Sequence, residues 1–303
     1  MKALAIAGLA LASVISGLSY LWQKLALQGL PPATVILGRN LVAIACTLVW
    51  MRARGGIAWR FTRRETGRLA LLGILAYALP LLVGIQGVKR STSGNASILI
   101  LLEPASILLF SRLLLGETVR RGQVIGVAAG LAGALCLTLE TAPVGDLLSG
   151  EYRLGNALLA FHALLWGLYA PIVRPLAERH RSVELVFGSM LFALVLMVPA
   201  SAAEMVSFTP GPELPRALFW TAFLGVVVSF GTTMAWTFFL RHLPASATAP
   251  FAFLQPLSGV LAGALVLGER LSREAIVGGV LIGAGMLLVA RVPRGRSAAA
   301  ESA

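Results

Sequence analysis

Apolar runs long enough to cross a lipid bilayer make up most of this chain. A transmembrane helix needs roughly 20 consecutive apolar residues, and a charged fraction of 13% is too low for a soluble protein of 303 residues. Many of the 32 glycines and 15 prolines fall inside these runs, which membrane helices tolerate because neighbouring helices satisfy the freed backbone groups. We therefore predict an all-α membrane protein with ten transmembrane helices, near residues 3–27, 32–51, 69–88, 93–115, 122–140, 154–177, 184–203, 216–240, 244–267 and 275–291.

Basic residues set the expected orientation of these helices. A net charge of +12 would suit a nucleic-acid ligand, but Lys and Arg lie in the short loops between apolar runs, where they act as topology signals. With the N-terminus in the cytoplasm, the cytoplasmic loops collect most of the 25 Lys and Arg residues, including the cluster from Arg52 to Arg68. We expect both termini to be cytoplasmic, and we expect the lipid bilayer, not nucleic acid, as partner.

The chain contains an internal repeat. Residues 101–117 read LLEPASILLFSRLLLGE, and residues 253–269 read FLQPLSGVLAGALVLGE. A shift of 152 residues aligns the two stretches without a gap. Earlier in each half the similarity is weaker, and there Gly17 matches Gly167. The match extends beyond the stretches, where an arginine and two glycines recur as Arg121/Arg273, Gly126/Gly278 and Gly133/Gly285.

The repeat predicts two halves of opposite orientation. Five helices in each half is an odd number, so the second half enters the membrane from the other side. Inverted repeats are typical of secondary transporters, whose substrate site lies near the midplane between the repeats. Duplication in a scaffold or a membrane enzyme is the alternative. The expected units are a first repeat at 1–140, an external linker at 141–153, a second repeat at 154–291 and a cytoplasmic tail at 292–303.

The repeated residues resemble those of a known family. The pattern of Pro104 with Gly116-Glu117, and of Pro256 with Gly268-Glu269, is similar to the drug/metabolite transporter superfamily in its ten-helix EamA group. Within that group the chain looks most like the YddG-type exporters of aromatic amino acids, although no short motif encodes the substrate. The resemblance implies export of small metabolites through a bacterial inner membrane, with no ATPase domain and no cofactor.

Polar side chains in the fourth apolar segment are the first candidates for a substrate site. Glu103 lies near the middle of that segment, where a carboxylate costs about 2.5–3.5 kcal/mol. It could carry protons, bind a substrate ammonium or form a structural pair with Arg39. Gln255 takes the equivalent place in the second half and cannot titrate. Asn95 and Leu99 fall on one helical stripe, which suits either a cavity or interhelical hydrogen bonds.

Two prolines are candidate hinges. Pro104 and Pro256 lie inside their predicted helices, where each removes a backbone N–H and frees a carbonyl four residues back. Such kinks can shape a cavity and let a helix bend, or they can serve packing alone.

Aromatic residues inside the predicted membrane segments form the second set of candidates. His162, Trp166 and Tyr169 are spaced i, i+4, i+7 and so share a helix face. Aromatic faces pack well on aromatic or cationic solutes, although such residues can also face lipid. Arg39 could contact a substrate carboxylate or snorkel to the outer interface. The expected ring contacts to substrate are Tyr77, His162, Trp166, Tyr169, Trp236 and Phe253.

Other classes of function fit less well. No HExxH or GxSxG pattern occurs and the three histidines are scattered, so nothing indicates a catalytic or metal centre. An exchanger of nucleotide sugars should carry several basic residues at mid-depth, and only Arg39 comes close. We expect a secondary transporter that exports amino acids, aromatic ones foremost, by alternating access. An exchanger of nucleotide sugars or drug-like cations, or a non-transport scaffold, is the alternative.

Overall fold

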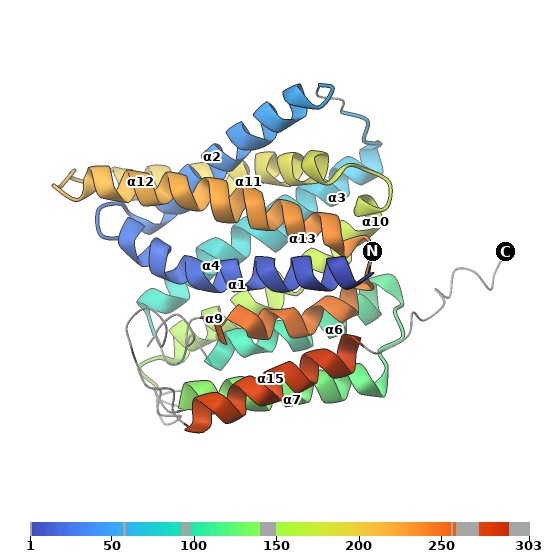
Figure 1. Ribbon diagram of the computed structural model, residues 1–303. Coiled ribbons are helices and arrows are strands. Elements are labelled where there is room, and N and C mark those ends of the chain that lie inside the picture. Colours follow the sequence, from blue (N-terminus) through green and yellow to red (C-terminus); the bar gives the residue numbers. More distant parts are fainter. Residues whose placement is uncertain are drawn as a thin grey trace.

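The chain folds into stacked layers of helices. The computed structural model describes residues 2–56, 59–91, 95, 98–139, 150–255, 257–258 and 273–290. Within these ranges every regular element is a helix, and successive helical segments run back and forth across the molecule (Figure 1). The predicted all-α class is confirmed for this part of the chain.

Among the described residues, six helical segments are long and apolar enough to cross a membrane. They coincide with six of the predicted segments, and α7 (Arg121–Leu139) and α15 (Arg273–Ala290) coincide with two more. The six are α1 (Lys2–Ala26), α2 (Pro32–Ala53), α3–η1–α4 (Arg63–Gly73, Ile74–Ala78, Leu79–Lys89), α9–α10 (Arg153–Trp166, Tyr169–Ala177), α11 (Ser182–Met205) and α12–η3–α13 (Leu214–Leu224, Gly225–Thr232, Thr233–Leu240).

The segments predicted near residues 93–115 and 244–267 are less regular than expected. The 3₁₀ turn η2 (Ile100–Leu102) precedes α6 (Glu103–Leu115), and the 3₁₀ helix η4 (Ala245–Phe253) contains Pro250. Pro104 lies within the first two positions of α6 instead of interrupting one continuous α-helix, because a missing N–H costs little at a helix start. Pro256, the other predicted hinge, lies outside the described residues.

Irregular helical turns recur at matching places in the two halves of the chain. The widened π-type turns η1 and η3 begin at Ile74 and Gly225, close to the 152-residue shift of the sequence repeat. The 3₁₀ segments η2 and η4 end at Leu102 and Phe253, with nearly the same separation. Wide turns inside α-helices are frequent at functional sites, and these two turn Tyr77 and Ser229 into the interior.

Glycines bring α7 and α15 into close contact. A Cβ atom at Gly133 would lie 2.5 Å from the carbonyl oxygen of Gly278, and one at Gly285 would lie 2.4 Å from that of Gly126. Small residues allow membrane helices this approach. The contact is reciprocal, because the glycine pair of each helix touches the equivalent pair of the other, and the two helices run antiparallel side by side (Figure 1).

A second pair of equivalent contacts also joins the two halves of the chain. A Cβ atom at Gly17 of α1 would lie 2.0 Å from Oγ of Ser258, and one at Gly167, directly after α9, would lie 2.0 Å from Oγ of Ser106. Gly17 corresponds to Gly167 in the sequence repeat, and Ser106 corresponds to Ser258. The same type of packing contact therefore occurs twice, each time between a glycine of one half and a serine of the other.

Candidate functional site

Four ring-bearing side chains meet inside the bundle. The Trp166 ring, at the end of α9, lies 6.3 Å from that of Tyr77 in η1, 6.3 Å from that of His162 and 6.5 Å from that of Tyr169, between centroids. The first two pairs meet edge-on, at 89° and 87°, which the quadrupoles of the rings favour. We call Tyr77, His162, Trp166 and Tyr169 the central aromatic cluster.

Burial differs within this cluster. Tyr77 and Tyr169 are buried, and the Tyr169 hydroxyl lies 3.1 Å from Oγ1 of Thr237 in α13. Trp166 and His162 are only half-buried. The two tyrosines are thus fixed in the core, while Trp166 and His162 are the partly exposed members of the cluster.

His162 has a fixed ring orientation. Its Nδ1 lies 2.6 Å from the carbonyl oxygen of Pro80 in α4, and because a carbonyl only accepts, Nδ1 carries the proton. Gly84, one turn later in α4, allows the approach, since a Cβ there would lie 2.4 Å from Nδ1. His162 therefore joins α9 to α4 and holds the helix that carries Trp166.

Arg39 of α2 lies next to the cluster and is 7% exposed. Its partners include Ser229 of η3, whose Oγ accepts from Nε at 2.7 Å, and Gln23 of α1, whose Oε1 accepts from Nη1 at 3.3 Å. The Tyr77 side chain lies near the same Ser229. Ser229 thus connects the guanidinium to the cluster. The sequence did not predict Ser229 or Gln23 as site residues, because isolated neutral side chains in apolar helices give no spacing signal.

Asn95 forms hydrogen bonds between helices. Its Nδ2 donates to Oδ1 of Asn156 in α9 at 3.1 Å and to Oγ of Ser91 at 3.2 Å, and Asn95 is fully buried. Leu99, one turn further along, is half-buried. Asn156 was not predicted. These contacts match the interhelical alternative that the sequence left open for Asn95.

The remaining predicted residues lie in different surroundings. Glu103 is the first residue of α6 and Gln255 follows η4, and both are half-buried. Trp236 packs partly buried between two core clusters. Phe253 is 1% exposed, and its ring presses on α7, since a Cβ at Gly130 would lie 2.4 Å from it. Phe253 thus packs in the core that includes α7, whereas the cluster rings pack with another core.

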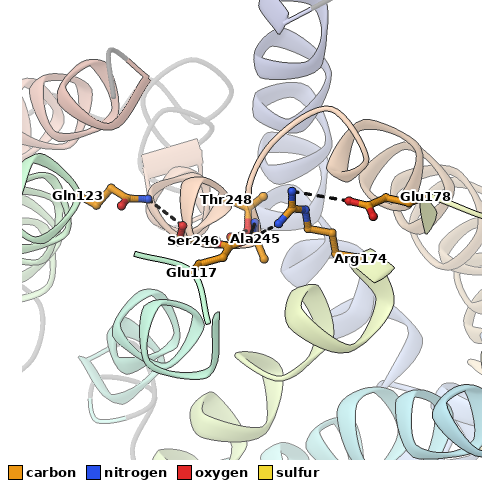
Figure 2. A network of polar contacts seen from close by, with 7 residues as sticks. All are labelled: Glu117, Gln123, Arg174, Glu178, Ala245, Ser246 and Thr248. Atoms are coloured by element: carbon orange, nitrogen blue, oxygen red, sulfur yellow. Dashed lines mark hydrogen bonds and ion pairs between the residues drawn. The ribbon is translucent and has the colours of Figure 1, made fainter. Parts of the chain in front are cut away.

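A network of polar contacts surrounds Glu117, the residue that ends the first repeated stretch (Figure 2). Gly116 has φ +63°, a left-handed conformation that ends α6. The Glu117 carboxylate then accepts from the backbone N–H groups of Ala245 at 3.0 Å and Ser246 at 2.9 Å. These groups open η4, and a carboxylate both satisfies them and suits the positive end of the helix dipole.

Arg174 of α10 completes this network. Its Nη1 pairs with Oε1 of Glu117, and its Nη2 lies 3.7 Å from Oε1 of Glu178. Nε2 of Gln123 in α7 donates to Oγ of Ser246 at 2.8 Å. The Glu117 network, which we define as Glu117, Gln123, Arg174, Ala245 and Ser246, therefore ties the first half of the chain to the second. It lies where α6 ends and η4 begins, and α6 ends on the side of the bundle where α1 begins (Figure 1).

Sequence reasoning used Gly116-Glu117 only as a marker of the repeat. The signal for its role was present, because a glycine followed by a carboxylate directly after an apolar helix is a helix stop with an acceptor attached. The partner could not be identified, since Arg174 and Ala245 are far from Glu117 in the sequence.

Known proteins match this chain over nearly its full length. A 25% identical relative, a probable terminal-alkyne amino-acid exporter of Streptantibioticus cattleyicolor, aligns over 90% of this chain and 89% of its own. A probable amino-acid metabolite efflux pump of Escherichia coli is 23% identical over 91% of both chains. A solved crystal structure superposes with a TM-score of 0.76 at 20% identity, over 95% of both chains, which shows a shared fold.

The family model that matches covers both halves of the chain. It is the model of the EamA-like transporter family, and it matches residues 3–139 and 153–291. The chain is therefore a multi-pass membrane protein that belongs to the EamA-like transporter family, within the drug/metabolite transporter superfamily.

Proposed function

We propose that this protein is an inner-membrane secondary transporter that exports amino acids, aromatic ones foremost, by alternating access. The central aromatic cluster beside Arg39 is the observation that carries the proposal. A buried cation close to Tyr77 of this cluster suits a small solute with a carboxylate and an aromatic side chain. The names of two relatives, an amino-acid exporter and an amino-acid metabolite efflux pump, agree with this class of solute.

The transport cycle needs two halves that can exchange conformations. We propose ten membrane helices in two inverted five-helix repeats. The reciprocal glycine contact supports this, because matching residues that touch across two antiparallel helices are what a two-fold axis perpendicular to those helices produces. The exchanged Gly17/Ser258 and Gly167/Ser106 contacts support the same axis. The family model also matches each half separately.

The Glu117 network is suited to close one end of the passage. It joins residues of both halves (Figure 2), at the end of the bundle where α6 ends and α1 begins. The basic loops place that end in the cytoplasm, so both termini are cytoplasmic in this proposal. Opening toward the cytoplasm then requires Glu117 to leave Arg174 and the start of η4. In this proposal Pro104 and Pro256 serve as hinges, and Leu99, Glu103, Trp236 and Gln255 border the solute passage. Asn95 and Phe253 support that passage by packing between helices.

Other solutes fit the described residues less well. Arg39 is the one buried cationic side chain in the part of the chain that the structure describes, whereas a nucleotide sugar would need several. A drug-like cation would depend on Glu103 instead. The buried guanidinium beside the aromatic cluster favours a carrier over a scaffold.

Counterflow in proteoliposomes tests the proposal. Vesicles loaded with unlabelled phenylalanine should accumulate radiolabelled phenylalanine, tyrosine or tryptophan, and empty vesicles should not. Uptake of nucleotide sugars with no uptake of any amino acid would replace this function by the exchanger. No uptake of either class would favour the scaffold.

A further inference from the structure

Arg39 is held where parts of both halves converge on the central aromatic cluster. Its helix, α2, belongs to the first half, as does the wide turn η1 that carries Tyr77. The wide turn η3 that carries Ser229 belongs to the second half. Ser229 accepts from Nε of Arg39 and also lies near the Tyr77 side chain. A guanidinium at this junction can respond to any movement of one half against the other.

We infer that Arg39 binds the carboxylate of the transported solute, with Ser229 and Gln23 among its resting partners. The inference rests on the proposed function and names the group of the solute that the site recognises. The solute class is therefore amino acids and related carboxylates. Amines of the same shape that lack the carboxylate are excluded.

The resting partners suit such an exchange. Ser229 and Gln23 present a hydroxyl and an amide oxygen, which are neutral acceptors, and the Gln23 contact is long at 3.3 Å. A carboxylate accepts two parallel N–H bonds from one guanidinium, and hydrogen bonds between charged groups are about twice as strong as those between neutral groups. A solute carboxylate can therefore displace Gln23, while Ser229 keeps the Arg39 side chain in place.

The rings complete the recognition. Tyr77 is close enough to Arg39 to interact with it electrostatically, and the Tyr77 ring touches that of Trp166. A solute bound through its carboxylate at Arg39 would then place its side chain along Tyr77 and Trp166. Neither the cation nor the ring cluster is specific alone. Together they select a molecule that carries both a carboxylate and an aromatic ring.

The test compares two solutes of equal ring structure, phenylalanine and 2-phenylethylamine, in proteoliposome counterflow. Wild type should accumulate phenylalanine and show little or no accumulation of the amine. Arg39→Gln should lose phenylalanine counterflow by about 10- to 100-fold, the effect of removing a hydrogen-bonded charge partner. Arg39→Lys keeps the charge but loses the two parallel N–H donors, and its phenylalanine counterflow should lie between that of wild type and that of Arg39→Gln. Ser229→Ala, which leaves the guanidinium intact, should raise the half-saturating phenylalanine concentration about 3- to 10-fold.

The outcomes separate this inference from the proposed function. If wild type transports no amino acid, the proposed function itself fails. If wild type transports phenylalanine and Arg39→Gln keeps the acid-over-amine preference, the inference is overturned while the function stands. Monodisperse elution in detergent shows whether each variant is folded. If Arg39→Gln fails to fold, Arg39→Lys decides, since an unchanged preference and an unchanged half-saturating concentration there would equally overturn the inference.

Discussion

The central aromatic cluster and the Glu117 network both join the first half of the chain to the second, but they do so with different interactions. The cluster meets through ring edges, and such pairs contribute about 0.5–1.5 kcal/mol each beyond area burial. The network combines an ion pair with two backbone hydrogen bonds at the start of a helix. Ring contacts tolerate replacement by a similar surface, whereas the network requires one geometry.

In the proposed transport cycle, this difference suits the two regions to different parts. A solute ring can take the place of a protein ring at the cluster, so that region suits binding. The network is either made or broken, so it suits a closure with two states. The predictions below alter one region and leave the other intact, from the largest expected effect to the smallest.

Removing the carboxylate of the network should have the largest effect on stability. Glu117→Ala leaves the partly buried Arg174 without its main partner and uncaps η4. We expect a loss of about 2–4 kcal/mol in the free energy of unfolding, measured by denaturant unfolding in detergent. The matched control is Glu178→Ala, which removes an exposed partner 3.7 Å from the same arginine and should cost less than about 1 kcal/mol. Equal losses would show that the network adds nothing beyond a surface ion pair.

The glycine contact between α7 and α15 gives the next largest effect. Gly285→Ala places a Cβ 2.4 Å from the Gly126 carbonyl oxygen, so the helices must separate, and we expect a loss of about 1–3 kcal/mol. Gly283→Ala in the same helix has open space around its Cβ and should be neutral or stabilising by up to about 1 kcal/mol, because alanine favours helix more than glycine does. Thermal unfolding of the two variants side by side measures the difference. Equal unfolding temperatures of the two variants would show that the close contact does not contribute to stability.

Removing a ring of the cluster should impair transport more than stability. We expect Trp166→Ala to reduce phenylalanine counterflow at least about tenfold, which is about 1.4 kcal/mol of lost interaction with the solute. Trp50→Ala is the control, since Trp50 is 42% exposed on the surface of the bundle and should leave counterflow within about twofold. Unchanged counterflow in Trp166→Ala, with normal yield of the purified protein, would remove the cluster from the binding site.

Much of the fold was predictable because the length of an apolar run is a local signal. Each of the six long helical segments falls on a predicted one, and the i, i+4, i+7 spacing correctly grouped His162, Trp166 and Tyr169. The meeting of Tyr77 with Trp166 was proposed only as a shared role, since no spacing relates η1 to α9. The widened turns were not predicted, because nothing in an apolar stretch such as residues 225–232 distinguishes a π-type turn from an α-helix.

The site was less predictable than the fold for a physical reason. Contacts such as Arg39 with Ser229, or Glu117 with Ala245, join residues more than a hundred positions apart. Periodicity constrains only one helix at a time, so it could place Phe253 in a helix but not reveal that its ring packs on Gly130 of α7.

Accessibility of two equivalent arginines tests the inverted repeat most directly. Arg121 and Arg273 begin α7 and α15 and are both exposed. Each is replaced in turn by cysteine in a protein that lacks Cys46 and Cys136, and a membrane-impermeant thiol reagent is added to intact cells or to inside-out vesicles. We predict labelling of the Arg121→Cys protein only from the cytoplasmic side and of the Arg273→Cys protein only from the outside. Labelling of both from the same side would contradict the opposite orientation of the two halves.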